Sequence, residues 1–374
     1  KLIDEPQNLS TLVGSNYKIL LRWEASETTG VTYNVYRSET PYFDLTDAEL
    51  VAEGLTETYW NDYNLNYGKT FYYKVTAVKS FSGHARESLP SYEAWATVVD
   101  EDEVNKMLGL QDYWTYSGFT TGSGTGYVNV ANGNVVYTTT DILVSDPFLA
   151  AVMRRTFNSE ARTKTAMGYG WDYSFNTALL KEFSAAGIET GMILKDGDGS
   201  LHRFEKTAEN TYESAKGTFM KLIYNSELNE YQIKRKDGIV YHYDAQTMQL
   251  EKFSDANGNV LSFTYDDRGN VVEVENNVGE VIELSYIVSN AEIGDPDYNY
   301  INEHPDMLAS VSWTPEGTTS SDIVYNYTYT ADDVLSSARS VIENDTTYEE
   351  SFTYTDGKLT KITDPANKDT ALEY

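Results

Sequence analysis

The feature that most constrains the fold is a phrase of about 21 residues that occurs twice in succession near the middle of the chain. In the stretch FSDANGNVLSFTYDDRGNVVEVENNVGEVIELSY, residues 253–286, Val260 and Phe263 of the first copy correspond to Val281 and Leu284 of the second. Each copy has two short segments of alternating polarity around an Asn- and Gly-containing turn, which is typical of a β-hairpin. So short a period predicts stacked β-units that bury a face only against their neighbours.

Further copies extend the repeat toward the end of the chain. The segments 250–265, 271–286 and 359–374 align position by position, and a looser copy begins at YTYTADDVLSSARSV. Residues 287–322 interrupt the series, and we expect them to form an inserted loop. Two copies depart from the pattern, because GKLTKITDPANKDTA has Lys-Asp where the turn usually holds Gly, and YTADDVL lacks the Gly before its strand. These departures leave the register of the two units open.

Composition limits the class of protein and of partner. The chain has 374 residues, of which 40% are hydrophobic, so it is long enough for two or three domains with real cores. The 58 acidic against 28 basic residues give a formal net charge of -30, so we expect no nucleic-acid partner and no anionic membrane surface. The absence of cysteine excludes disulfides and thiolate metal sites. No apolar run reaches membrane-spanning length, and both ends of the sequence suggest a fragment of a longer protein.

Residues 1–98 form a separate block of alternating segments. YKILLRWEAS, VTYNVYRSE and TFYYKVTAVKS each alternate apolar with polar residues, as a strand with one buried face does. A Pro near the start, Trp23 on an early strand, and the later YNVYR and YYKVTAV resemble a fibronectin type III domain. The resemblance implies a β-sandwich, in which YFDLTDAELVAEGL is a longer connection than a minimal module has.

Two further regions lie between this block and the repeats. Residues 99–112, VDEDEVNKMLGLQD, place three apolar residues at helical spacing after an acidic first turn, which predicts a short helical linker. Residues 113–249 have the pattern of successive hairpins, because KDGDGS and KRKDGIV are Asp-Gly turns between alternating segments. The predicted fold class is therefore all-β, with residues 250–374 as the repeat region.

The repeats and the region before them resemble a known family. FTYDDRGNVVEV with the following GEVIELSY resembles the YD repeat of the Rhs, wall-associated and teneurin group of proteins. Upstream, GTGYVNVANGNVVY, MRRTFNS and GYGWDYSFN resemble the lead-in to such repeats. The resemblance covers residues 113–374 and implies an antiparallel β-sheet strip that spirals into a hollow shell. In bacterial members such a shell encloses a C-terminal toxin domain, and in teneurins it forms an adhesive scaffold.

Two acidic segments are candidate metal sites. DGDGS alternates Asp196 and Asp198 as a Ca²⁺-binding loop does. The sixth and twelfth positions lack the Gly and Glu that such a loop requires, so the pattern favours a hairpin turn. The loop IGDPDYNYINEHPD offers Asp295, Asp297 and Asp306 to a cation, while its composition also suits an exposed, solvated loop.

No arrangement of residues predicts an active site. His202 in LHRFE and His242 in VYHYD fall in strand patterns, where packing is the ordinary role of the side chain. The sequence has no nucleophile elbow and no spacing of paired carboxylates typical of a hydrolase. Trp114, Trp171 and Trp313, with the many tyrosines, would suit a carbohydrate platform, although burial is the default for Trp in strands. We therefore expect no enzyme activity, no catalytic residue and no cofactor.

Two functions are consistent with these patterns. The first is a non-catalytic structural scaffold, the N-terminal part of a secreted or cell-wall-associated bacterial YD-repeat shell that carries a C-terminal toxin of the same longer chain. The second is an extracellular adhesin or carbohydrate-binding protein, whose sandwich or exposed aromatic residues contact cell-wall or surface glycans. An aromatic cleft at the surface would favour the second function. The sequence leaves the passenger and any ligand open.

Overall fold

The computed structural model is built from antiparallel β-strands, which confirms the all-β prediction. It describes residues 3–14, 18–81, 83–98, 108–111, 113–144, 149–161, 164–184, 186, 188–215, 217–266, 268–287, 307–318, 320–342 and 346–374. Within these ranges the helical structure is one short 3-10 helix, Leu45–Asp47. None of the described residues belongs to a helix with the length and apolar character needed to cross a membrane.

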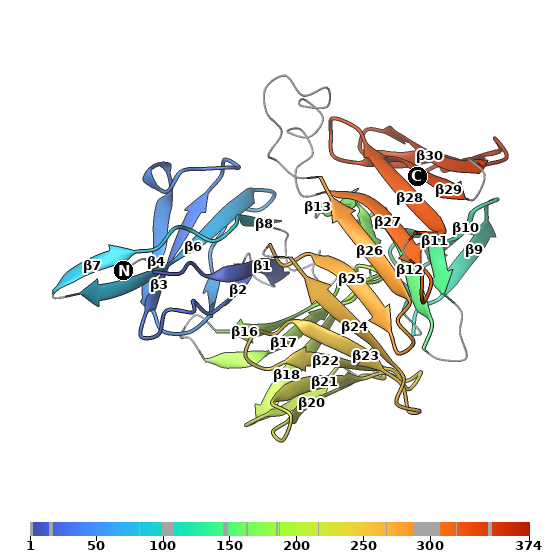
Figure 1. The fold of residues 1–374 in the computed structure, drawn as a ribbon. Coiled ribbons are helices and arrows are strands. Elements are labelled where there is room, and N and C mark those ends of the chain that lie inside the picture. Colours follow the sequence, from blue (N-terminus) through green and yellow to red (C-terminus); the bar gives the residue numbers. More distant parts are fainter. Residues whose placement is uncertain are drawn as a thin grey trace.

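The first eight strands form a two-sheet β-sandwich with its own core (Figure 1). Their bounds are β1 Gln7–Gly14, β2 Lys18–Glu24, β3 Thr32–Ser38, β4 Glu49–Leu55, β5 Tyr59–Asp62, β6 Thr70–Phe81, β7 His84–Glu87 and β8 Ala94–Thr97. One sheet has the order β1-β2-β5, and the other has the order β4-β3-β6-β7, with β8 paired to β6. Trp23, Val35 and Val75 are fully buried between the sheets, because alternate residues of each strand face inward.

The lead-in region forms a five-stranded sheet of order β15-β12-β11-β10-β9 and a small two-stranded ribbon. The bounds are β9 Tyr116–Thr120, β10 Gly124–Asn129, β11 Val135–Val144, β12 Ala151–Asn158, β13 Lys164–Thr165, β14 Gly168–Tyr169 and β15 Trp171–Tyr173. Gly168 adopts a φ of +90°, and a side chain there would collide with the carbonyl oxygen of Asp333. The ribbon can therefore approach the repeat region closely only with glycine at this position.

Seventeen strands form one continuous antiparallel sheet, hereafter the strip, in which each strand pairs with the next along the chain. The bounds are β16 Ala178–Phe183, β17 Glu189–Lys195, β18 Leu201–Ala208, β19 Thr211–Ser214, β20 Lys221–Asn225, β21 Glu230–Lys234, β22 Val240–Asp244, β23 Leu250–Ser254, β24 Val260–Tyr265, β25 Val271–Asn276, β26 Val281–Tyr286, β27 Leu308–Thr314, β28 Ile323–Tyr329, β29 Leu335–Ile342, β30 Thr346–Thr355, β31 Lys358–Thr363 and β32 Asp369–Ala371. Such up-and-down pairing keeps the hydrogen bonds between strands local in sequence, as stacked repeats require.

The strip and the lead-in sheet share one hydrophobic core (Figure 1). Within β26, Ile282 and Leu284 are buried while Glu283 between them is exposed, so one face of the strip is apolar. That face packs against the lead-in, because Met153 and Trp171 belong to the same buried cluster. The apolar face of the strip is therefore buried partly between neighbouring units and partly against the lead-in sheet.

In four of the repeat turns an Asp or Asn side chain at the first position caps the backbone, namely at Asp255, Asp266, Asn276 and Asp364. The Asp255 carboxylate accepts the backbone N–H of Asn257 at 2.8 Å and of Asn259 at 2.9 Å. The Asp364 carboxylate accepts the equivalent pair at 2.9 Å each. Capping of this kind satisfies backbone donors that the hairpin leaves unpaired, so the Asp or Asn of the phrase fixes where each strand ends.

The two departures from the repeat pattern keep the same turn geometry. Gly258 has a φ of +87°, and its equivalents Asn367 and Asp333 have φ values of +59° and +56°. Asn and Asp are the non-glycine residues that tolerate this left-handed region best. Residue Asn367, rather than the Lys-Asp pair that follows it, therefore stands in the glycine position, and the register of both units is fixed.

The recurrent Tyr forms a hydrogen bond within its unit through the side-chain hydroxyl. The hydroxyls of Tyr265, Tyr286, Tyr329 and Tyr354 each donate to the carbonyl of the first residue of the preceding strand, at 2.8, 2.9, 2.6 and 2.8 Å. In all four cases the Tyr also marks a shift of register toward the following strand. Each Tyr therefore bonds across its own hairpin where the ladder is interrupted by a bulge.

The sandwich packs on the first strands of the strip. Leu12 and Leu20 of the sandwich form a small core with Leu180 and Ile193 of β16 and β17. Beside it, the ammonium of Lys18 lies 2.8 Å from the carboxylate of Glu182, and both side chains are buried. The start of the strip is therefore covered rather than open to another chain.

Two connecting segments, residues 287–322 and 99–112, were predicted from the sequence. Residues 287–322 were expected to form an inserted loop, but β27 lies within them and pairs with β26 and β28, so the prediction is wrong for Leu308–Thr314. Leu308 and Val311 of the sequence LASVSWT are buried against the core. The apolar area that they bury favours a strand here, although the residues before it have the composition of a loop. Of the predicted helical linker, residues 99–107 and 112 lie outside the described residues.

We expect Tyr265→Phe to lower the free energy of unfolding by about 1 kcal/mol, because it leaves the carbonyl of Leu250 without its hydroxyl donor. Urea-induced unfolding followed by intrinsic fluorescence measures this change. Tyr348→Phe is the matched control, since Tyr348 is 49% exposed on β30. Equal stability of the two variants would show that the Tyr hydroxyl contributes nothing to the repeat.

Candidate functional site

A buried charge cluster joins the lead-in sheet to the late strands of the strip. The cluster consists of Asp141 and Tyr137 on β11, Arg155 on β12, Tyr327 on β28 and Glu350 on β30. Arg155 comes from the MRRTFNS phrase, and the alternation of β12 turns it inward while Arg154 faces solvent. Its partner Glu350 lies 195 positions later in the chain.

The geometry satisfies both carboxylates. The Arg155 guanidinium donates to the two oxygens of Asp141 at 2.7 and 2.9 Å and to Glu350 at 3.0 Å. The hydroxyl of Tyr327 donates to Asp141 at 2.6 Å, and that of Tyr137 donates to Glu350 at 2.5 Å. A fork of two parallel N–H bonds to one carboxylate is the strongest arrangement that a buried ion pair can take.

The surroundings of Arg155 retain its charge. Burial acts to lower the pKa of the guanidinium, but the carboxylates of Asp141 and Glu350 outweigh it and hold that pKa well above its ordinary value. The rings of Trp171 and Phe352 lie 5.6 and 5.7 Å from the guanidinium carbon. The cation is therefore both paired and packed between aromatic faces.

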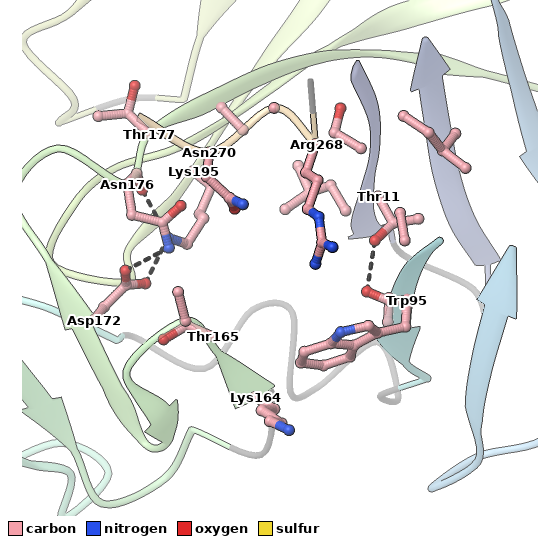
Figure 2. Close-up of a pocket in the computed structure, with 18 of the residues that line it drawn as sticks. Thr11, Trp95, Lys164, Thr165, Asp172, Asn176, Thr177, Lys195, Arg268 and Asn270 are labelled. Atoms are coloured by element: carbon pink, nitrogen blue, oxygen red, sulfur yellow. Dashed lines mark hydrogen bonds and ion pairs between the residues drawn. The ribbon is translucent and has the colours of Figure 1, made fainter. Parts of the chain in front are cut away.

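A second feature is a cavity of about 510 Å³ where the sandwich, the lead-in and the strip meet (Figure 2). Thr11 and Trp95 line it from the sandwich, and the Thr11 hydroxyl donates to the Trp95 carbonyl at 2.6 Å. Lys164 lines it from the lead-in ribbon, and Arg268 reaches toward it from the turn between β24 and β25. Three parts of the chain that are distant in sequence therefore form its walls.

The opposite wall of the cavity holds an ordered ion pair. The ammonium of Lys195 lies 2.5 Å from the carboxylate of Asp172 and donates to the carbonyl of Asn176 at 2.7 Å. Burial raises the pKa of Asp172, although Lys195 acts against the shift. Figure 2 shows this pair facing Trp95 across the open space, with Asn270 beside it.

The acidic candidates of the sequence have structural partners where the structure describes them. Asp196 and Asp198 lie in the turn between β17 and β18, which confirms the predicted hairpin. The Asp196 carboxylate forms an ion pair with Arg235, and that of Asp198 accepts the Ser200 hydroxyl at 2.6 Å. Among the described residues no group of three or more acidic, His or Cys side chains could hold a metal ion. Asp295, Asp297 and Asp306 lie outside the described residues.

His202, His242 and Trp171, which the sequence singled out, are buried, whereas Trp313 is partly buried and Trp114 belongs to none of the hydrophobic cores of the described residues. His202 and His242 are buried in β18 and β22 and bond to Ser200 at 2.9 Å and to Glu230 at 2.9 Å. Trp171 is buried as expected, and its indole N–H donates to the Tyr354 hydroxyl at 2.7 Å. Trp171 also lines the cavity described above, and so does Trp95, which the sequence did not single out.

Sequence reasoning also missed Arg155 as the centre of the charge cluster. The signal was present, since two adjacent arginines in an otherwise apolar strand pattern must face opposite sides of a sheet. One of them must then be buried and needs an anionic partner. The sequence gives no indication that the partner is Glu350 rather than any of the other acidic residues.

Residues 125–204 match the family model described as Domain of unknown function (DUF6531). That range covers β11, β12 and β15, the lead-in strands that form the charge cluster and part of the cavity.

Curated relatives cover more of the chain. The tRNA3(Ser)-specific nuclease WapA of Bacillus spizizenii is 25% identical over 210 residues, and the tRNA nuclease WapA of Bacillus subtilis is 25% identical over 209 residues. Each match covers 56% of this chain and 8% of the relative, so the chain spans a small part of the length of these proteins.

Two solved structures also match this chain, one over most of its length and one over a quarter of it. The Tc holotoxin pore of Photorhabdus luminescens is 11% identical, with a TM-score of 0.24, and the match covers 95% of this chain and 25% of that one. An Fn3-like protein from Clostridium thermocellum is 30% identical, with a TM-score of 0.22, over 25% of this chain and 92% of that one. Both TM-scores are too low to support an argument about the fold, which follows from the pairing of the strands.

The relatives correct one expectation. We expected no enzyme activity, yet the curated proteins that this chain resembles are named tRNA nucleases. The motifs within this chain gave no sign of such an activity, and the matched segment is 8% of the length of each nuclease.

We expect Arg155→Ala to lower the free energy of unfolding by about 3–5 kcal/mol, because it leaves two carboxylates buried without their cation. Arg154→Ala is the matched control, since the neighbouring side chain is exposed and its loss should change stability by less than about 0.5 kcal/mol. Urea unfolding of both variants measures the difference. Equal losses would contradict the assigned role of Arg155.

Stability should fall on acidification partly through His202. Burial lowers the pKa of its imidazole, although Asp196 and Asp198 oppose the shift. The unfolded chain then binds a proton that the folded chain does not, so this stability is present above a pH of about 6.5 and is lost as the pH falls below it. His202→Gln should reduce the loss of unfolding free energy between about pH 7.5 and 5.5. The exposed His84→Gln is the control, and an unchanged slope for His202→Gln would contradict the prediction.

Proposed function

We propose that this chain is the early part of a YD-repeat shell within a longer toxin-bearing protein, and that the passenger of that protein is a nuclease. The observation that carries the proposal is the common core of the strip and the lead-in sheet. A strip whose apolar face covers another sheet can continue to add units along its length, because each unit needs only its neighbours. The likeness to the WapA proteins supports a toxin-associated scaffold.

The charge cluster has a specific part in this proposal. It joins β12 of the lead-in to β28 and β30 of the strip, so it sets how tightly the strip curves around the lead-in. A buried ion pair of this kind favours one arrangement over others, because any slip of register leaves a charge unpaired. We infer that it fixes the first turn of the shell wall.

The remaining expectations become parts of the same proposal. We propose a division into residues 1–98, 99–112, 113–249 and 250–374, with a fibronectin type III-like domain first. The sheets β1-β2-β5 and β4-β3-β6-β7 support that assignment. We also propose a secreted or cell-wall-associated location, which follows from the resemblance of the repeats to the wall-associated group.

Protease protection of the natural full-length chain tests the proposal. We expect a C-terminal passenger to resist a protease at concentrations that degrade it once it is expressed alone, because the shell wall excludes the protease. Arg155→Ala should make the passenger accessible, and Arg154→Ala should not.

The passenger released in this way should cleave tRNA, as the names of the relatives lead us to expect. A full-length chain that ends soon after these repeats, or a passenger equally sensitive in both states, would overturn the shell proposal. A protected passenger without activity on tRNA would overturn only the nuclease assignment.

A further inference from the structure

We propose that the cavity between the sandwich, the lead-in and the strip binds a saccharide that carries an acidic group. The cavity measures about 510 Å³, which lies in the range of sites that enclose small organic ligands. One or two sugar rings would fill such a space. The inference is independent of the shell, because it concerns a site that the sandwich forms with the lead-in and with the strip only as far as β25.

The charge of the lining differs from the charge of the rest of the molecule. The chain has twice as many acidic as basic residues, 58 against 28. The cavity reverses this balance with five cationic residues, Arg22, Lys74, Lys164, Lys195 and Arg268, and three anionic ones, Glu93, Glu160 and Asp172. Low-dielectric walls strengthen the field of such a group, so the cavity attracts an anion to an otherwise repelling surface.

The cations are held in place rather than extended into solvent. Lys164 pairs with Asp333 at 2.6 Å and lies 5.4 Å from the ring centroid of Trp95. Arg268 lies 4.8 Å from the ring centroid of Tyr92. Charges fixed in this way lose little conformational entropy when a ligand binds, and an acidic group can bridge them without displacing the protein contacts.

The uncharged part of the lining matches the rest of a sugar. Trp95 offers an aromatic surface at the wall formed by the sandwich, and a sugar ring can stack its apolar C–H face there. Thr165, Thr177 and Asn270 surround the same space with short hydroxyl and amide groups. Such groups both donate and accept, as the hydroxyls of a saccharide require.

A buried cation within the lining supports a preformed site. Arg22 is nearly fully buried, and burial lowers the pKa of its guanidinium to about 10. Its Nη1 donates to the carbonyl of Thr247, while its Nε has no hydrogen-bond acceptor among the described residues. A cation retained beside a cavity at this desolvation cost favours an anionic occupant over a neutral one.

Isothermal titration calorimetry of the 374-residue chain tests the inference with four probes: digalacturonate, glucose 1-phosphate, the neutral disaccharide digalactose and the acidic peptide tetraglutamate. We expect an acidic saccharide to bind at least about tenfold more tightly than digalactose and than tetraglutamate. The affinity should fall with added salt, because charge attraction contributes to it. Whichever of digalacturonate and glucose 1-phosphate binds more tightly tells whether the cavity prefers a carboxylate or a phosphate.

Three variants locate the binding. Trp95→Ala and Lys164→Gln should each weaken it by about fivefold or more, and Trp95→Phe should retain most of it because the stacking surface remains. Lys361→Gln is the control, since Lys361 pairs with Asp369 on the exposed surface of the strip. Thermal denaturation of each variant shows whether it folds. If Trp95→Ala does not fold, the affinities of Trp95→Phe and Lys164→Gln test whether the ligand binds in the cavity.

Three results would overturn the inference. The first is the absence of binding by both acidic saccharides at about 10 mM, a concentration at which even weak specific sites are occupied. The second is equal loss of affinity in Lys361→Gln and in the cavity variants. The third is tighter binding of tetraglutamate, which would make the cavity a site for an acidic peptide.

Discussion

The arrangement of the lead-in and the strip depends on the burial of one guanidinium. Arg155 lies in the middle of the shared core, and a buried charge is stable only when its partners are close and correctly oriented. Asp141 comes from the next strand of the same sheet, so it could pair with Arg155 in many arrangements. Glu350 and Tyr327 come from the strip, and their hydrogen bonds exist in only one position of the strip relative to the lead-in.

The repeat supplies a second constraint, which acts within each unit. An Asp or Asn caps the turn, a residue with positive φ follows, and a Tyr bonds back across the hairpin. Three of these tyrosines also meet the lead-in, because Tyr286 contacts the Tyr173 hydroxyl at 2.9 Å, Tyr329 donates to the carbonyl of Ala166 at 3.4 Å, and Tyr354 accepts the indole N–H of Trp171. The same hydroxyl therefore fixes the local bulge and the packing of the strip on the core. Local and long-range preferences agree, as they do in sequences that specify a single fold.

The N-terminal sandwich acts on the strip in two ways. It covers the first strands through Leu12, Leu20 and the buried Lys18–Glu182 pair. It also supplies one wall of the cavity, where Trp95 faces the Lys195–Asp172 pair of the opposite wall. Lys164 and Arg268, two of the cations that line the cavity, are not members of the buried charge cluster around Arg155. The scaffold role and the binding role are therefore physically separable in this chain.

The sequence by itself determined the local structure of this protein. The alternation of polarity gave the strands, the Asp-x-Asn-Gly phrase gave the turns, and the spacing of the repeat gave the order of strands in the strip, because all of these depend on residues close together in the chain. Only the tertiary structure decided which distant residues meet. The pairing of Arg155 with Glu350, the strand at Leu308–Thr314 and the convergence of Thr11, Lys164 and Arg268 on one cavity depend on how the strip curves around the lead-in. That curvature follows from packing and charge burial across the whole core, and no pattern within a short window of sequence records it.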